Sequence, residues 1–278
     1  MPAGELLRSM GAGVVRFDHL DRADVARLGG RPRAVRPSWL IEVPHGFDTY
    51  AAVQCSAHKR FASQLRKHRK LHREHEVVVV TDDRDPRSVE LLRRWKSAQY
   101  RRTSRRDRFA VPWIDRLVRD LLVRHDGHVR AELASLRVDG QVVAVHLGLR
   151  RGGRLVSWFP AYDPAAAALS PGSALFFSLA ATHGNRIIDL GKGDEAFKQA
   201  MANATETVAE VDLWRPSPAA LGHAAVRLPP SLAERAVLSS PPARRAARSA
   251  LLAVGRLRSA RGDGRPYDQG QPPSPTGL

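Results

Sequence analysis

The stretch LSPGSALFFSLAATHGNRIIDLGKGDEAFK, residues 169–198, decides the fold. Ser170 and Pro171 predict the start of a helix, because serine accepts a hydrogen bond at an N-cap and proline suits the first helical position. Such a start leaves backbone N–H groups unpaired at the positive end of the helix dipole, which suits a phosphate. A strand is predicted at 187–190, and it breaks into a turn rich in glycine and acids. Reactive groups often lie on loops at strand ends.

Upstream of this stretch the sequence predicts a β-meander. Asp139 and Gly140 form a pair typical of a tight hairpin turn. Apolar residues then alternate with small or polar ones over 143–150, which is the period-two pattern of a half-buried strand. Gly152 and Gly153 turn the chain into a third strand at 155–162. The predicted order is three strands, a phosphate-type loop, a helix, a strand, a helix and a final strand at 207–214.

Four motifs in this order resemble the GNAT acyltransferase superfamily. The likeness is greater to the bacterial acetyltransferase group associated with cellulose and exopolysaccharide biosynthesis. The matching motifs are VDGQVVA at 138–144, AYD at 161–163, LSPG at 169–172 and DLGKGDEAFK at 189–198. The superfamily's usual acyl-CoA loop, Gln/Arg-x-x-Gly-x-Gly/Ala, is replaced by SPGSA at 170–174.

The resemblance implies an α/β fold, with a mixed, largely antiparallel sheet that has a V-shaped opening and is flanked by helices. It also implies an acyltransferase that moves an acetyl group from acetyl-CoA to an amine or hydroxyl on a sugar-containing acceptor, in polysaccharide or cell-envelope biosynthesis. We expect the donor phosphates at the helix start, on Ser170, Gly172, Ser173 and Ala174.

Acyl transfer needs a base for the acceptor's proton and donors that steady the oxyanion. Asp189 or Asp194 could be the base if its pKa is raised, and Lys198 could orient the acid or bind a phosphate. Tyr162 could protonate the leaving thiolate, as tyrosine can in GNAT-like proteins. The alternatives are a solvated turn in which Asp194 caps the next helix, and a Tyr162 that packs at a strand end. We expect direct attack without a covalent intermediate, because Cys55 is a poor nucleophile candidate.

The histidines are weaker candidates. His68, His72 and His75 share one helical face, but in the zinc-protease motif a glutamate directly follows the first histidine, and here it does not. We therefore expect a packing face and no metal. His146 could reach the cleft as a base, or it could be a hydrogen-bonded histidine within the sheet.

The formal net charge is +17, from 45 Lys and Arg against 28 Asp and Glu. Such a charge favours anionic partners: CoA or another phosphate donor, anionic lipid, nucleic acid or acidic polysaccharide. A GC-rich genome would also raise the arginine content. Basic clusters at 59–73 and 101–108 could bind phosphates or form solvated faces. Two alternative functions stay open: a Fem-like aminoacyl transferase that uses charged tRNA, and a non-enzymatic polybasic protein that binds a membrane or polymer.

Composition divides the chain into a poorly ordered segment at 1–37, the acyltransferase domain at 38–216, a basic helical extension at 217–261 and a disordered tail at 262–278. Before the meander we expect strands at 39–43 and 77–80 and helices at 47–75, 87–101 and 114–122.

One cysteine allows no internal disulfide and suits a reducing compartment. The sequence shows neither a signal peptide nor a membrane span. We expect a cytoplasmic protein, which could lie at the inner face of the membrane.

Overall fold

In the computed structural model, an eight-stranded sheet runs through the described part of the chain, which comprises residues 2–124, 128–182, 184, 186–193 and 195–215. The strand order is β1-β8-β2-β7-β6-β5-β4-β3. The strands are β1 (Val14–Leu20), β2 (Pro32–Glu42), β3 (Val77–Val80), β4 (Arg130–Val138), β5 (Gln141–Arg151), β6 (Arg154–Tyr162), β7 (Ile187–Lys192) and β8 (Ala204–Trp214). β6 and β7 are parallel, whereas β2–β7, β2–β8, β3–β4, β4–β5 and β5–β6 are antiparallel. This confirms the predicted mixed, largely antiparallel sheet.

The described residues divide into two units, one within 2–15 and 213–215 and the other within 16–212. In the first unit, α1 (Ala3–Ser9) precedes a short loop, and the backbone N–H of Arg215 donates to the carbonyl of Gly13 at 3.0 Å. The second unit contains the sheet apart from the ends of β1 and β8. The predictions for 217–261 and 262–278 lie outside the described residues.

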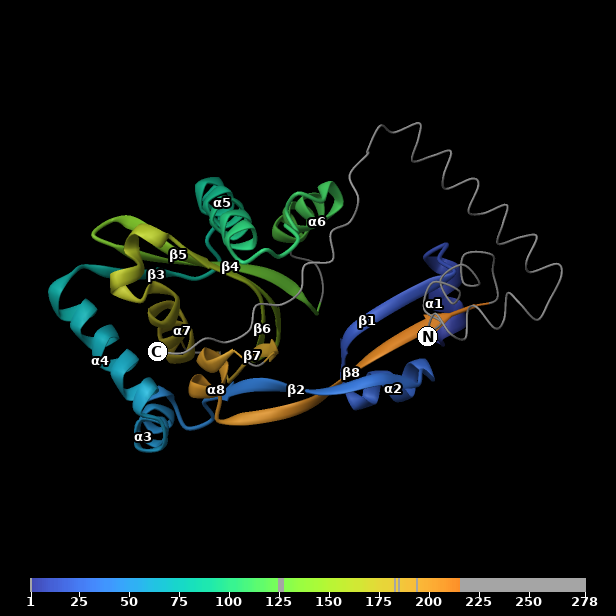
Figure 1. Ribbon diagram of the computed structural model, residues 1–278, viewed down its shortest axis with the longest axis horizontal. Coiled ribbons are helices and arrows are strands. Elements are labelled where there is room, and N and C mark those ends of the chain that lie inside the picture. Colours follow the sequence, from blue (N-terminus) through green and yellow to red (C-terminus); the bar gives the residue numbers. More distant parts are fainter. Residues whose placement is uncertain (1, 125–127, 183, 185, 194, 216–278) are drawn as a thin grey trace, which may run out of the picture. The chain divides into compact units, whose positions relative to one another are not determined.

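Helices cover both faces of the sheet in the second unit (Figure 1). One face carries α3 (Phe47–Ala57), α4 (Lys59–Glu74), α7 (Pro171–Ala181) and α8 (Ala196–Met201), and the other carries α5 (Pro86–Arg102) and α6 (Pro112–Val123). A hydrophobic core lies on each face of the sheet, and successive residues of β4 point to opposite faces. Leu136 packs in the core under α4 and α7, whereas Leu133 packs in the core under α5 and α6. On the first face the rings of Phe61 and Phe177 meet edge to face, with 5.2 Å between centroids.

Local sequence patterns predicted most of these elements. The three meander strands are present, and Asp139 (φ 50°) and Gly140 (φ 77°) form the hairpin turn between β4 and β5. The helices predicted at 87–101 and 114–122 and the strand at 77–80 are also confirmed. The single helix predicted at 47–75 is wrong in one respect, because the extended backbone of His58 (φ −133°, ψ 105°) divides it into α3 and α4.

The N-terminal segment differs from its prediction. Little regular structure was expected at 1–37, yet this range holds α1, β1, α2 (Arg22–Leu28) and the first part of β2. Asp21 caps α2 by accepting a hydrogen bond from the backbone N–H of Asp24 at 2.7 Å, and Gly29 ends the helix in the left-handed conformation. The strand predicted at 39–43 is the last part of β2. The first part gains its partner from β8, which follows it by more than a hundred residues, so local composition did not reveal it.

The parallel pairing of β6 and β7 ends early and leaves the sheet open. Only three residue pairs join the two strands, the last being Val156 with Asp189. β6 nevertheless continues to Tyr162 and β7 to Lys192. β6 also carries an extra residue, Trp158, between the partners of Leu147 and Gly148 on β5, and such a bulge bends a strand. The two strands therefore part in the V-shaped opening that was expected.

Among the described helices, none combines the length and apolar character needed to cross a membrane.

Candidate active site

A cleft of about 700 Å³ occupies the opening between the parted strands. Its walls are the ends of β6 and β7 that do not pair with each other, residues 157–162 and 190–192. The start of α7 closes it on one face of the sheet, and α5 and the loop after it close it on the other. The cleft is thus lined by residues of helices that pack on opposite faces of the sheet.

The start of α7 presents unpaired backbone donors to this cleft. The first intrahelical hydrogen bond runs from the N–H of Ala174 to the carbonyl of Ser170 at 3.1 Å, so the N–H groups of Gly172 and Ser173 precede it. The expected side-chain cap is wrong. Ser170 lies in the left-handed conformation (φ 52°, ψ 47°) rather than the extended one of a usual N-cap, and its hydroxyl makes no capping bond.

The backbone conformation at position 172 does not require a glycine. Its φ is not positive, and a Cβ added there would meet only Cδ1 of Tyr162, at an ordinary contact distance of 3.6 Å. The missing side chain instead leaves the first helical turn open to a ligand. Of the four predicted donor residues, Ser170, Gly172 and Ser173 line the cleft, while Ala174 is buried beneath it.

Two of the four predicted catalytic residues line the same cleft. Tyr162 ends β6 beside Gly172 and is half exposed. Lys198, on α8, donates from Nζ to the carbonyl of Lys192 at 2.6 Å and forms an ion pair with Glu195 at 3.2 Å. Asp194 lies outside the described residues.

Asp189 does not reach the cleft. Its carboxylate is fully buried behind the wall, where it accepts hydrogen bonds from the Ser38 hydroxyl at 2.6 Å, Arg154 Nη2 at 2.6 Å and the Gly191 N–H at 2.9 Å. Burial alone would raise the pKa of Asp189, but hydrogen bonds from His19, Ser38 and Arg154 outweigh it and hold that pKa well below its usual range. A carboxylate in this state holds strands together and is a poor proton acceptor.

His146 of β5 is also buried and does not line the cleft. Burial lowers its pKa to about 3, with the charges of Lys96 and Arg150 acting in the same direction. Its Nε2 is 3.0 Å from the hydroxyl of Ser157, which does line the cleft. This geometry fits a neutral, hydrogen-bonded histidine within the sheet.

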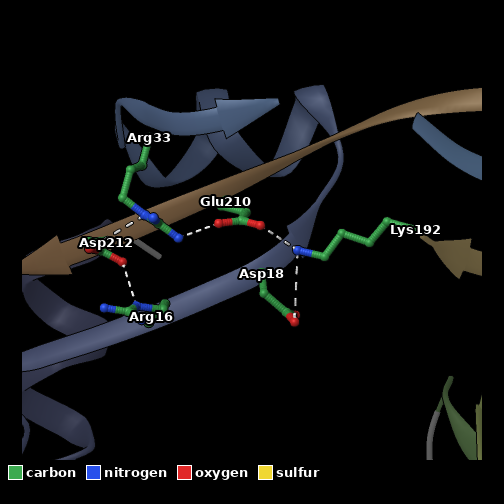
Figure 2. A network of polar contacts seen from close by, with 6 residues as sticks. All are labelled: Arg16, Asp18, Arg33, Lys192, Glu210 and Asp212. Carbon is green, nitrogen blue, oxygen red and sulfur yellow. Dashed lines mark hydrogen bonds and ion pairs between the residues drawn. The ribbon is translucent and has the colours of Figure 1, made fainter. Parts of the chain in front are cut away.

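At the edge of the cleft, Lys192 of β7 belongs to a network in which basic and acidic side chains pair with one another (Figure 2). Lys192 Nζ lies 2.7 Å from a carboxylate oxygen of Glu210 and 3.9 Å from one of Asp18. Glu210 pairs in turn with Arg33, and Asp212 pairs with Arg16 at 3.0 Å. Lys192 is therefore already neutralised by carboxylates, although it lines the cleft.

Sequence reasoning missed Lys96 on the opposite wall, where Arg105 of the predicted basic cluster at 101–108 also lies. Lys96 is only 9% exposed, and its Nζ donates to the carbonyl of Pro160 at 2.9 Å and lies 5.5 Å from the ring centroid of Tyr100. Burial lowers its pKa to about 8, with Arg105 and Lys198 adding to the effect. One signal was available: Lys96 follows Leu92 by one helical turn, so it occupies a position on the apolar face of α5.

The sequence matches one family model, described as "Acetyltransferase (GNAT) domain", over residues 59–199. Among solved structures, the crystal structure of FemX has a TM-score of 0.54 at 12% identity, and the match covers 79% of this chain and 76% of that one. A tandem GNAT protein from the clavulanic acid biosynthesis pathway has a TM-score of 0.39 at 12% identity, covering 77% and 68%. No curated protein matches the sequence. At these identities the structural likeness concerns the fold alone.

Proposed function

The chain belongs to the acetyltransferase (GNAT) domain family, and from this premise we propose that it transfers an acetyl group from acetyl-CoA to an amine or hydroxyl of a sugar-containing acceptor. The four motifs that it shares with bacterial acetyltransferases of cellulose and exopolysaccharide biosynthesis support that acceptor class.

The observation that carries the proposal is the open first turn of α7 at the parting of β6 and β7. The N–H groups of Gly172 and Ser173 face the cleft together with the positive end of the helix dipole, an arrangement that suits the pyrophosphate of CoA. Beyond Val156 the edge of β6 has no β7 partner. The thioester arm of the donor would lie along this free edge.

In the proposed reaction the acceptor's nitrogen or oxygen attacks the thioester carbonyl carbon. The C–S bond breaks, and the products are the acetylated acceptor and CoA. Tyr162 stands beside Gly172 and would give a proton to the leaving thiolate, while Lys198 would hold the acidic turn in place through the carbonyl of Lys192. Asp189 would act by fixing β7, which leaves Asp194 as the proposed base.

A second candidate is aminoacyl transfer from charged tRNA, and the net charge of +17 favours it. The structural likeness to FemX adds only that the folds agree. The third candidate, a polybasic protein without enzymatic activity, predicts that changes in the cleft leave function intact.

Calorimetry on the full chain with acetyl-CoA, CoA and uncharged tRNA, at low and at physiological salt, tests the proposal. We expect saturable binding of acetyl-CoA that survives physiological salt and is weakened by Gly172→Val. Binding of tRNA should be weaker and should fall steeply with salt, since it depends on counterion release. Tight tRNA binding without acetyl-CoA binding would replace the proposal with the Fem-like candidate.

A further inference from the structure

We propose that the α5 side of the cleft is a subsite for an anionic group on the acceptor, a carboxylate or a phosphate, held by Lys96 and Arg105. The inference rests on the proposed function in one respect, which is that the donor enters from the α7 side.

The cleft has two ends on opposite faces of the sheet. Gly172 and Ser173 line it from α7, which packs with α4 on one face. Lys96 and Tyr100 line it from α5, which packs with α6 on the other face, and Arg105 follows in the loop after α5. A donor on the α7 side leaves the α5 side for the molecule that attacks the thioester.

The lysines that line the cleft from β7 and α8 form close ion pairs, whereas the cations at the α5 end do not. Lys192 has Glu210 and Asp18 as partners, and Lys198 has Glu195. Within the described part of the chain, neither Lys96 nor Arg105 has a carboxylate oxygen within 4.0 Å. The carboxylate of Glu195 acts on both cations from farther away, but its close ion pair is with Lys198. Among the described residues, Lys96 and Arg105 therefore face the cleft without a carboxylate in direct contact.

Lys96 is placed to receive an anion rather than to support the fold. An ammonium group has three N–H donors, and among the described residues Lys96 uses one of them, toward the carbonyl of Pro160. Keeping a cation nine-tenths buried beside Arg105 is unfavourable unless an anion compensates it. Arg105 adds a planar fork of donors, which suits carboxylate and phosphate oxygens.

The test is calorimetry on the full chain saturated with CoA, using three amino sugars. Glucosamine is the probe without an anionic group, glucosamine 6-phosphate carries a phosphate, and muramic acid carries a carboxylate. We expect at least one anionic probe to bind roughly tenfold more tightly than glucosamine, as a charge-assisted hydrogen bond allows. The two anionic probes distinguish phosphate from carboxylate.

Matched variants assign that preference to residues. Lys96→Met removes the charge while nearly keeping the length of the side chain, and Arg105→Gln removes the charge at an exposed position. In each variant the affinities for the anionic probe and for glucosamine should differ by less than about threefold. Lys96→Arg should retain part of the wild-type preference for the anionic probe. Arg106→Gln, which changes the neighbouring exposed arginine outside the cleft lining, is the control and should behave as wild type.

The pH dependence separates anion binding from proton abstraction by Lys96. The groups around its ammonium are Arg105, Lys198, Glu195, the ring of Tyr100 and the buried His146, whose pKa of about 3 keeps it neutral over this range. An anion-binding Lys96 loses affinity for the anionic probe as the pH rises past about 8, because it loses its proton. A base would leave affinity unchanged and raise turnover over the same range.

Three results would overturn the inference: equal or undetectable binding of all three probes to the wild type, an unchanged preference in both Lys96→Met and Arg105→Gln, or a loss of CoA affinity in these variants as large as the loss for the probe. The last result would assign the two cations to the donor. If CoA itself fails to bind the wild type, the proposed function fails, and the same titrations without CoA still decide whether the anion subsite exists.

Discussion

Arg154 of β6 and Asp189 of β7 form an ion pair, with 2.6 Å between Nη2 and Oδ2, where the pairing of the two strands ends. Asp189 also accepts the hydroxyl of Ser38 on β2, and Arg154 also contacts Glu206 on β8 at 2.6 Å. Four neighbouring strands are therefore joined at the base of the cleft. This junction determines where the opening between β6 and β7 begins.

Removing the charge of Asp189 should destabilise the protein. Asp189→Asn leaves Arg154 and Ser38 facing a neutral amide in a fully buried position, and we expect a loss of about 3 kcal/mol in the free energy of unfolding, measured by urea titration. Glu206→Gln is the matched control, since Glu206 is 30% exposed and should cost less than about 1 kcal/mol. Equal effects of the two variants would show that burial of Asp189 contributes nothing.

Asp189 should also make stability sensitive to acid. Its pKa is lowered in the folded state, so the unfolded chain takes up this proton first, at about pH 4. The stabilisation is present above that pH and is lost as the pH falls toward the folded-state pKa. Urea titrations between about pH 5 and pH 2 should show a steeper loss in the wild type than in Asp189→Asn.

Gly172→Val should weaken donor binding while the fold survives. The added Cβ meets only Tyr162 at an ordinary contact distance, and the valine methyl groups should cover the N–H groups at the start of α7. We expect a loss of acetyl-CoA affinity of roughly tenfold or more by calorimetry, and a smaller loss for Gly172→Ala. Ser178→Ala, on the same helix outside the cleft lining, is the control. Unchanged affinity in a folded Gly172→Val protein would move the donor site elsewhere.

Tyr162→Phe should slow turnover without changing donor affinity. The hydroxyl is the only group removed, and a positioned acid contributes roughly a hundredfold to such a step. Steady-state kinetics should therefore show a lower kcat, while calorimetry gives an unchanged acetyl-CoA affinity. A wild-type kcat would leave Tyr162 as an aromatic side chain that packs at the end of β6.

Lys96→Met should stabilise the protein while it impairs acceptor binding. Burial lowers the pKa of Lys96 to about 8, so at pH 7 the folded protein carries an unfavourable buried charge. Removing it should raise the free energy of unfolding by roughly 1–2 kcal/mol, after allowance for the lost hydrogen bond to Pro160. Wild-type stability should also rise between about pH 8 and pH 10, where the unfolded chain binds the extra proton, and the variant should lack this rise.

The sequence was informative wherever a pattern is local. Alternation along 143–150 and the Asp139-Gly140 turn predicted the meander, and Pro171 predicted the start of α7, because each depends on neighbours in the chain. The state of Asp189 was not predictable in this way. Its partners His19, Ser38 and Arg154 come from three other strands, and only the folded chain shows that they neutralise it. Lys96 was overlooked because a single lysine on an amphipathic helix resembles a solvated residue until its burial is known.

The junction at Asp189 has a consequence for what can fold alone. The family match spans 59–199, yet Ser38, His19 and Glu206 all lie outside it, as do β1, β2 and β8. An isolated 59–199 fragment would end its sheet at β7, with an unpaired strand edge and with Asp189 deprived of two of its four donors, His19 and Ser38. Exposed edges of this kind pair with other chains. The smallest autonomous folding unit is therefore larger than the conserved-domain boundaries, and fragments cut at those boundaries should aggregate.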